Sequence, residues 1–252
     1  MQYMGSKNRM SKELVPIIQS YIIEDTVGYI EPFVGGANVI DKIKCKNKIG
    51  YDIHKELIAL LKYSQENELP ETISEEEYDQ VKNNKEDYPD WYVGLVGFCG
   101  SFGAKYFGGY ARGKKDNRDR PNEAIKNIKK QSNNLKDIDF ICQDFREIKD
   151  IKGYVIYCDP PYKGATKYST KEFPYDEFYN WCREMSKDNV VLISEYNMPE
   201  DFKCIWQKDN KINFDSNRVS NDSKNNRIEK YYTRIDSFYK KSFKEFIEEF
   251  FF

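Results

Sequence analysis

Two hydrophobic patterns alternate along most of the chain. Short runs rich in β-branched and aromatic residues, without polar alternation, are typical of strands buried in a parallel sheet. Other stretches space their apolar residues three or four positions apart, as Leu14, Ile17, Ile18 and Tyr21 do within residues 6–22. The first 62 or so residues therefore predict helix, strand, helix, strand, helix. The predicted strands of the whole chain lie within residues 27–33, 48–53, 138–144, 153–162 and 189–194.

Residues 65–136 follow a different pattern. They begin acidic and pass through a stretch rich in glycine and aromatic residues, with five glycines from Gly100 to Gly113. Glycine at that density disfavours regular structure, whereas residues 121–136 again predict a helix. The simplest fold is a doubly wound α/β sheet made by residues 1–64 and 137–252. An inserted, mainly helical domain at residues 65–136 interrupts it.

The last residues, 237–252, have a helical rhythm of their own. Tyr239, Phe243, Phe246, Ile247 and Phe250 recur every three or four positions and so share one face. A helix of this length is too short to cross a bilayer. It is expected to pack against the domain or to contact another copy, rather than to attach to a membrane.

Composition narrows the class of protein. Hydrophobic residues make up 39% of the chain and aromatic residues 15%, which indicates a folded domain. No apolar run is long enough to span a membrane and residues 1–10 lack a signal-peptide core, so a cytoplasmic protein is expected. Six scattered cysteines and the single histidine, His54, form no metal-binding pattern. We therefore predict reduced thiols, no metal, and a structural or surface role for His54.

Charge is distributed unevenly, although the formal net charge is only −2. Residues 65–90 hold ten acidic and two basic side chains, and residues 105–136 hold ten basic and three acidic ones. A basic segment of this kind either faces nucleic-acid phosphates or forms an ordinary solvated surface. Charge alone does not decide between these two interpretations.

Three loops after predicted strands carry candidate binding residues, because ligands of doubly wound sheets bind beyond the carboxyl ends of the strands. The segment "EPFVGGAN" brings paired glycines after the first strand but lacks the G-x-G-x-x-G spacing of a dinucleotide site. Asp52 ends the second strand, from where an acid reaches ribose hydroxyls. Asp144 ends a third. Taken singly, each of these three loops could also be a helix cap or a tight turn. Taken together, they predict a nucleoside pocket.

The run "YVIYCDPPY", residues 154–162, ends a buried strand in an acid, two prolines and a tyrosine. Prolines keep their carbonyl acceptors, so this loop offers several acceptors in one geometry. Asp159 and the carbonyl of Pro160 suit the two N–H groups of an exocyclic amine on a base, and Tyr162 can stack on its ring. The alternative is a structural turn that merely ends the strand.

These motifs, in this order, resemble the Dam-type (D12 class) DNA adenine N6-methyltransferases of the alpha arrangement. The resemblance rests on "YMGSK" near the N-terminus, "EPFVGG" and "DPPY", and covers residues 2 to about 199 and a segment at 225–232. It implies a Rossmann-like sheet, S-adenosylmethionine as cofactor, and double-stranded DNA as partner. It also implies methyl transfer to adenine N6 after base flipping.

Carried over to this sequence, the family pattern implies specific roles. Asp159, Pro160 and Tyr162 are the expected catalytic residues. The expected cofactor-binding residues are Tyr3, Lys7, Phe33, Gly35, Asp52, Asp144, Phe145 and Asp159. The insertion departs from the family pattern, so its expected DNA contacts rest on its basic charge instead: Arg112, Lys114 and Lys115 for phosphates, and Lys105, Tyr106 and Arg112 for bases.

The chain departs from the family at Ala37, where a third glycine is frequent, and at Ser6, where the N-terminal motif often has glycine. Both changes exchange small residues. The insertion lacks the "FNVPFG"-like stretch of relatives that recognise GATC, so the target sequence is open. Two alternatives remain: a methyltransferase for an amine in RNA or protein, and a DNA-binding relative without turnover.

Overall fold

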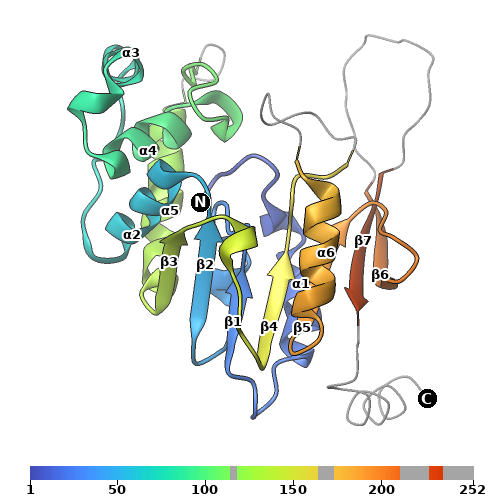
Figure 1. The fold of residues 1–252 in the computed structure, drawn as a ribbon. Coiled ribbons are helices and arrows are strands. Elements are labelled where there is room, and N and C mark those ends of the chain that lie inside the picture. The colour runs from blue at the N-terminus through green and yellow to red at the C-terminus, as the bar shows by residue number, and fades with distance from the viewer. Residues whose placement is uncertain (114–117, 164–172, 211–226, 235–252) are drawn as a thin grey trace, which may run out of the picture. The chain divides into compact units, whose positions relative to one another are not determined.

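The structure is a computed structural model that describes residues 1–113, 118–163, 173–210 and 227–234 (Figure 1). The chain divides into two compact units, Met1–Ile148 and Lys149–Phe252. The first unit contains α1 (Ser11–Ser20), β1 (Gly28–Glu31), β2 (Lys48–Asp52), α2 (Lys55–Glu66), α3 (Glu75–Asn83), α4 (Asp90–Cys99), α5 (Arg120–Leu135) and β3 (Ile138–Cys142). The second contains β4 (Tyr154–Cys158), α6 (Tyr175–Met185), β5 (Val190–Glu195), β6 (Lys203–Asn210) and β7 (Arg227–Arg234).

The strands of the first unit run in parallel in the order β3-β2-β1. Ile30 pairs with Ile49, and Asp52 at the end of β2 pairs with Cys142 at the end of β3. All four residues of β1 are buried, as the apolar run predicts. Tyr29 is fully buried, and its hydroxyl donates to Glu31 Oε1 at 2.7 Å, which satisfies both polar groups in the core.

Three of the four helices in the long connection from β2 to β3 come from the predicted insertion. α3 begins at a capping box, in which Ser74 Oγ accepts from the nitrogen of Glu77 and the Glu77 side chain accepts from the nitrogen of Ser74. α4 lies against α2 (Figure 1). The two helices approach so closely that a Cβ at Gly94 would lie 2.2 Å from the carbonyl oxygen of Glu56. α5 begins after Asp119, whose carboxylate accepts from the nitrogen of Asn122 at 2.9 Å.

The structure confirms the predicted strands and the helices at α1, α2 and α5. It also contains α6, β6 and β7, which the pattern did not predict, and it differs from the prediction elsewhere. The helix expected between the first two strands is wrong, because residues 32–47 contain only a 3-10 turn at Ile40–Lys42. The chain there takes positive φ angles of 48° at Gly35 and 54° at Ala37, which a right-handed helix excludes. The pattern also did not predict α4, since two glycines lie inside it.

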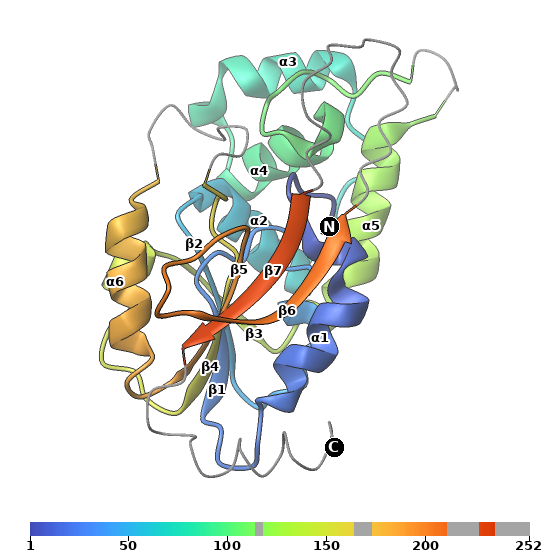
Figure 2. The ribbon, with the colours of Figure 1, turned by 90° about the vertical axis from the view of Figure 1, so that its right-hand side faces the viewer.

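In the second unit, β4 pairs in parallel with β5, and β7 runs antiparallel to both β5 and β6 (Figure 2). β7 covers most of the 225–232 segment that resembles the family. The predicted helix at residues 237–252 lies outside the described residues. No helix in the described part of the chain is long and apolar enough to cross a membrane.

Candidate active site

The strand ends of the first unit form one edge. Because β1, β2 and β3 are parallel, Glu31, Asp52 and Cys142 end them on the same side. The loops after β1 and β3 carry four of the residues expected to bind the cofactor, and Asp52 at the end of β2 is a fifth. The sheet therefore brings the bend after β1, the acid of β2 and the turn after β3 to one place.

The bend after β1 depends on its glycines. Gly35 has a φ of 48°, and a Cβ there would lie 2.9 Å from the ring of Tyr3. A Cβ at Gly36 would lie 2.7 Å from Cβ of Tyr3 and 2.6 Å from the side-chain nitrogen of Asn38. The absence of side chains lets the backbone pass against Tyr3, which places the N-terminal motif beside the bend.

Asp52 fixes this bend from the side of β2. Its Oδ2 accepts from the nitrogen of Gly35 at 3.1 Å, and its Oδ1 accepts from the nitrogen of His54 at 3.0 Å. Burial raises the pKa of the Asp52 carboxyl above its ordinary value, and the two backbone donors oppose this by stabilising the charged form. One carboxylate thus connects two loops.

Aromatic and apolar side chains accompany the acid. The rings of Phe33 and Phe145 lie 5.5 Å apart in a tilted arrangement. Ile53, next to Asp52, is 71% exposed, which is unusual for so large an apolar side chain at the end of a buried strand. The sequence pattern did not predict it as a site residue, since exposure depends on the neighbouring loops.

Asp144 has the role of a helix cap. Its Oδ1 accepts from the nitrogen of Arg146 at 2.9 Å, and its carboxylate forms an ion pair with the Arg146 guanidinium at 2.8 Å. Hydrogen bonds from Arg146 lower the pKa of the Asp144 carboxyl. This turn places Phe145, which is buried, against Phe33.

Tyr3 and Lys7 belong to the segment before α1. The Tyr3 ring packs 5.6 Å from that of Phe98, in α4. Phe98 also lies 5.1 Å from the ring of His54. Lys7 begins a 3-10 turn whose preceding residue, Ser6, accepts from the nitrogen of Asn8 at 3.2 Å. Burial lowers the pKa of His54, and Glu56, whose Oε2 lies 3.1 Å from His54 Nδ1, opposes this shift.

The loop of residues 159–162 in the second unit follows the buried strand β4 directly. The hydroxyl of Tyr175 donates to the carbonyl oxygen of Pro161 at 3.0 Å. The Tyr162 ring meets that of Tyr196 edge to face, with the ring centres 4.7 Å apart. Contacts from α6 and from the residue after β5 thus hold this loop on two sides.

Glu195 holds the far end of the same loop. Its side chain is buried at the end of β5, where Oε2 accepts from the nitrogen of Lys163 at 3.1 Å and Oε1 accepts from the nitrogen of Tyr196 at 2.7 Å. A buried carboxylate is costly unless it is hydrogen-bonded in this way. The sequence pattern missed Glu195 because its strand reads as uniformly apolar up to Ser194.

The predicted DNA contacts occupy different surroundings. Lys105 is exposed on a hairpin-like loop closed by the pairing of Ser101 with Tyr110, and Phe102 on the same loop is 66% exposed. Tyr106 is half-buried, 4.4 Å from the His54 ring. Arg112 forms a bidentate pair with Glu75. Lys114 and Lys115 lie outside the described residues.

A glycine bend and an acid at the carboxyl ends of parallel strands define a ligand site of a doubly wound α/β protein. A model of the family described as D12 class N6 adenine-specific DNA methyltransferase matches residues 3–96 and 96–223. The chain belongs to this family and is a methyltransferase. A search of curated proteins finds no match.

Comparison with solved structures finds 29 matching chains. Among them is HI0767 from Haemophilus influenzae, which is provisionally described as a methylase. It shares 9% sequence identity at a TM-score of 0.37, over 90% of this chain and 89% of that one.

Proposed function

We propose that the protein transfers a methyl group from S-adenosylmethionine to N6 of adenine in duplex DNA, after the base is flipped out of the helix. The observation that supports this most strongly is the intact 159–162 loop of a D12 family member, held by Tyr175, Tyr196 and Glu195. A loop fixed on both sides is suited to orienting an amine, and orientation is what this reaction needs.

The first unit fits the cofactor. Gly35 and Gly36 leave the backbone bare beside Tyr3, and Asp52 offers carboxylate oxygens next to an exposed apolar side chain, Ile53. Asp52 would accept from ribose hydroxyls, while Ile53 and Phe33 would cover apolar parts of the nucleoside. Tyr3, Lys7, Gly35, Asp144 and Phe145 complete the set proposed in this unit, and Asp159 is the cofactor-binding residue proposed in the second unit. S-adenosylmethionine, when bound, supplies the methyl group.

The second unit would hold the target amine. Asp159 and the carbonyl of Pro160 accept its two N–H groups, which directs the nitrogen lone pair away from the ring. Tyr162 stacks on the base, which stabilises the flipped state by about 1–3 kcal/mol and offsets an unstacking cost of similar size. This chain needs no strong base, because the amine becomes acidic only after it has gained the methyl group.

The insertion, residues 65–136, separates the catalytic segments 1–64 and 137–252 along the sequence. We propose that this insertion contacts DNA. Lys105 and Arg112 would neutralise phosphates together with Lys114 and Lys115, and Tyr106 would support their loop. Phe102 joins this set because it is the exposed aromatic residue on that loop, and exposed apolar side chains of DNA-binding proteins often enter between base steps.

The direct test is to incubate the protein with radiolabelled S-adenosylmethionine and either unmethylated duplex DNA, RNA or protein. Label in DNA, recovered as N6-methyladenine on nucleoside analysis, is the expected result. Label only in RNA or protein would favour the alternative amine substrate. Cofactor binding by calorimetry without any transfer would favour a DNA-binding relative without turnover.

A further inference from the structure

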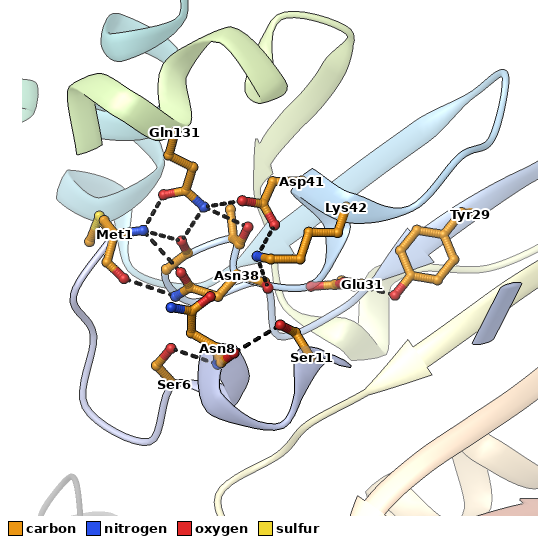
Figure 3. A network of polar contacts seen from close by, with 12 residues as sticks. Met1, Ser6, Asn8, Ser11, Tyr29, Glu31, Asn38, Asp41, Lys42 and Gln131 are labelled. Atoms are coloured by element: carbon orange, nitrogen blue, oxygen red, sulfur yellow. Dashed lines mark hydrogen bonds and ion pairs between the residues drawn. The ribbon is translucent and has the colours of Figure 1, made fainter. Parts of the chain in front are cut away.

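A buried glutamine links α5 to the bend after β1 (Figure 3). Gln131 lies on α5 and is 7% exposed. Its Nε2 donates to the carbonyl oxygen of Ala37 at 2.8 Å, to that of Gly36 at 3.2 Å and to Asp41 Oδ2 at 3.0 Å. Its Oε1 accepts from the nitrogen of Met1. Every polar atom of this amide is therefore used.

The same bend is held from its other side by Asp52. The nitrogen of Gly35 donates to Asp52, whereas the carbonyls of Gly36 and Ala37 accept from Gln131. Between these contacts Gly35 and Ala37 take positive φ angles. Ala37 bears a steric cost in that conformation, and such a conformation persists only where the surroundings impose it. Gln131 supplies part of that constraint.

The neighbours of this contact extend the connection. Asn38 donates to the carbonyl oxygen of Met1 at 3.0 Å, and Lys42 donates to the carbonyl oxygen of Asn38 at 2.7 Å and to Asp41 (Figure 3). The bend, the N-terminal segment and α5 thus share one buried polar network. Fully satisfied networks of this kind are rigid, and their members move together.

The outer surface of α5 is basic. Lys126 and Lys130 are exposed, Lys129 is half-exposed, and Arg120 begins the helix. These side chains belong to the basic segment proposed above to face DNA. A helix that meets DNA on one face and holds the cofactor loop on the other connects the two ligands physically.

We propose that Gln131 is a positioning residue through which DNA contact on α5 sets the conformation of the Gly35–Ala37 bend and so changes cofactor affinity. The proposal rests on the function proposed above. DNA contact that stabilises α5 in this position would stabilise the bend through Gln131, so cofactor would bind more tightly to the DNA complex. Thermodynamic linkage then requires cofactor to tighten DNA binding by the same factor.

The test measures the dissociation constant of S-adenosylhomocysteine by calorimetry, with and without sheared, unmethylated duplex DNA. The wild-type protein should bind several-fold more tightly with DNA, within the roughly 5–150-fold range of known couplings. Gln131→Met keeps the side-chain length but removes the amide. It should weaken binding about tenfold without DNA and bring the ratio of the two constants close to one. Gln207→Met makes the same exchange at an exposed position of β6, outside the insertion and the bend, and should leave the ratio unchanged.

Gln131→Asn, which keeps an amide but shortens its reach, provides a second variant if the methionine variant does not fold. A ratio that stays at the wild-type value in a folded Gln131 variant, or a wild-type ratio of one, would overturn the coupling while leaving the enzyme assignment intact. A wild-type protein that binds neither ligand would instead overturn the proposed function.

Discussion

The backbone nitrogen of Gly35 donates a hydrogen bond to Oδ2 of Asp52 at 3.1 Å, and this bond joins the glycine bend to the end of the neighbouring strand. The pairing of β1 with β2 brings the two residues to the same edge of the sheet. A carboxylate that already holds the bend is placed to present its remaining lone pairs to a ligand. Binding of the cofactor should therefore depend on the charge state of Asp52.

The first prediction concerns pH. Burial raises the folded-state pKa of Asp52 above 3.8, so its contribution to folding stability is present below that value and disappears as pH rises through the raised pKa. Cofactor affinity should change in the opposite sense, because only the charged form accepts freely from ribose hydroxyls. Calorimetry should show affinity rising with pH through this window in the wild-type protein. The Asp52→Asn variant should bind the cofactor more weakly, and its affinity should not rise with pH. An equal rise in that variant would mean that another group causes the pH dependence.

The second prediction concerns the bend itself. Gly35→Ala adds a Cβ at a φ of 48° and 2.9 Å from the Tyr3 ring, so it should weaken cofactor binding by tenfold or more and lower the melting temperature. Gly103→Ala is the matched control, since Gly103 also has a positive φ, of 64°, but has open space around it. Its cofactor affinity should equal that of the wild-type protein. Equal losses of affinity in both variants would attribute the effect to backbone strain alone.

The strands β1 to β5 were predictable because their cores are short apolar runs rich in β-branched and aromatic residues, whereas β6 and β7 carry many polar residues and were not predicted. The loops were harder. The bend at Gly35–Ala37 replaced an expected helix, and α4 formed despite Gly94 and Gly97, whose low helix propensity is outweighed by close packing against α2. Residue types alone indicated Asp52 and the 159–162 loop as candidates.

Other features of the candidate site could not be predicted, because they depend on which segments meet in three dimensions. Ile53 and Phe102 are exposed because no other part of the described chain packs over them. Burial of Glu195 and Gln131 reflects backbone groups, far along the chain, that these side chains satisfy. A local sequence pattern cannot predict hydrogen-bond partners that lie far along the chain. An apolar run, in contrast, predicts the burial of its own strand.

The third prediction tests the catalytic loop. Asp159→Ala should remove methyl transfer to DNA, lowering kcat by at least roughly 100-fold, because the variant has no side-chain acceptor to orient the amine. The fold should persist, as judged by circular dichroism and melting temperature. Normal turnover in a folded Asp159→Ala protein would contradict the assigned role.

The fourth prediction separates positioning from catalysis at the same loop. Glu195→Gln keeps the shape of the side chain but weakens its acceptance from the nitrogens of Lys163 and Tyr196. We expect kcat to fall about tenfold while the dissociation constant of the cofactor stays the same, because Glu195 contacts the amine-binding loop and not the bend. A parallel fall in cofactor affinity would show that Glu195 acts on the fold as a whole.

The fifth prediction concerns the basic segment. Neutralising Arg112, Lys114 and Lys115 to glutamine should weaken DNA binding and reduce its salt dependence. The slope of log K against log salt should fall by about 0.9 for each DNA phosphate that the variant no longer neutralises. Arg112 is paired with Glu75 in the free protein, so phosphate must compete with that carboxylate. Glu75→Gln should therefore strengthen DNA binding if Arg112 contacts phosphate. It should leave DNA binding unchanged if Arg112 only stabilises α3.

Lys152→Gln is the control for this experiment. It also removes one exposed positive charge, from an ion pair with Asp188, but its place before β4 lies at the end of the strand opposite the 159–162 loop. Its slope should match that of the wild-type protein in fluorescence anisotropy with a labelled duplex. If the triple variant keeps the wild-type slope, the basic segment is a solvated surface. If Lys152→Gln lowers the slope by as much per charge removed, the effect is one of net charge. Only a reduced slope confined to the triple variant supports DNA contact by the insertion.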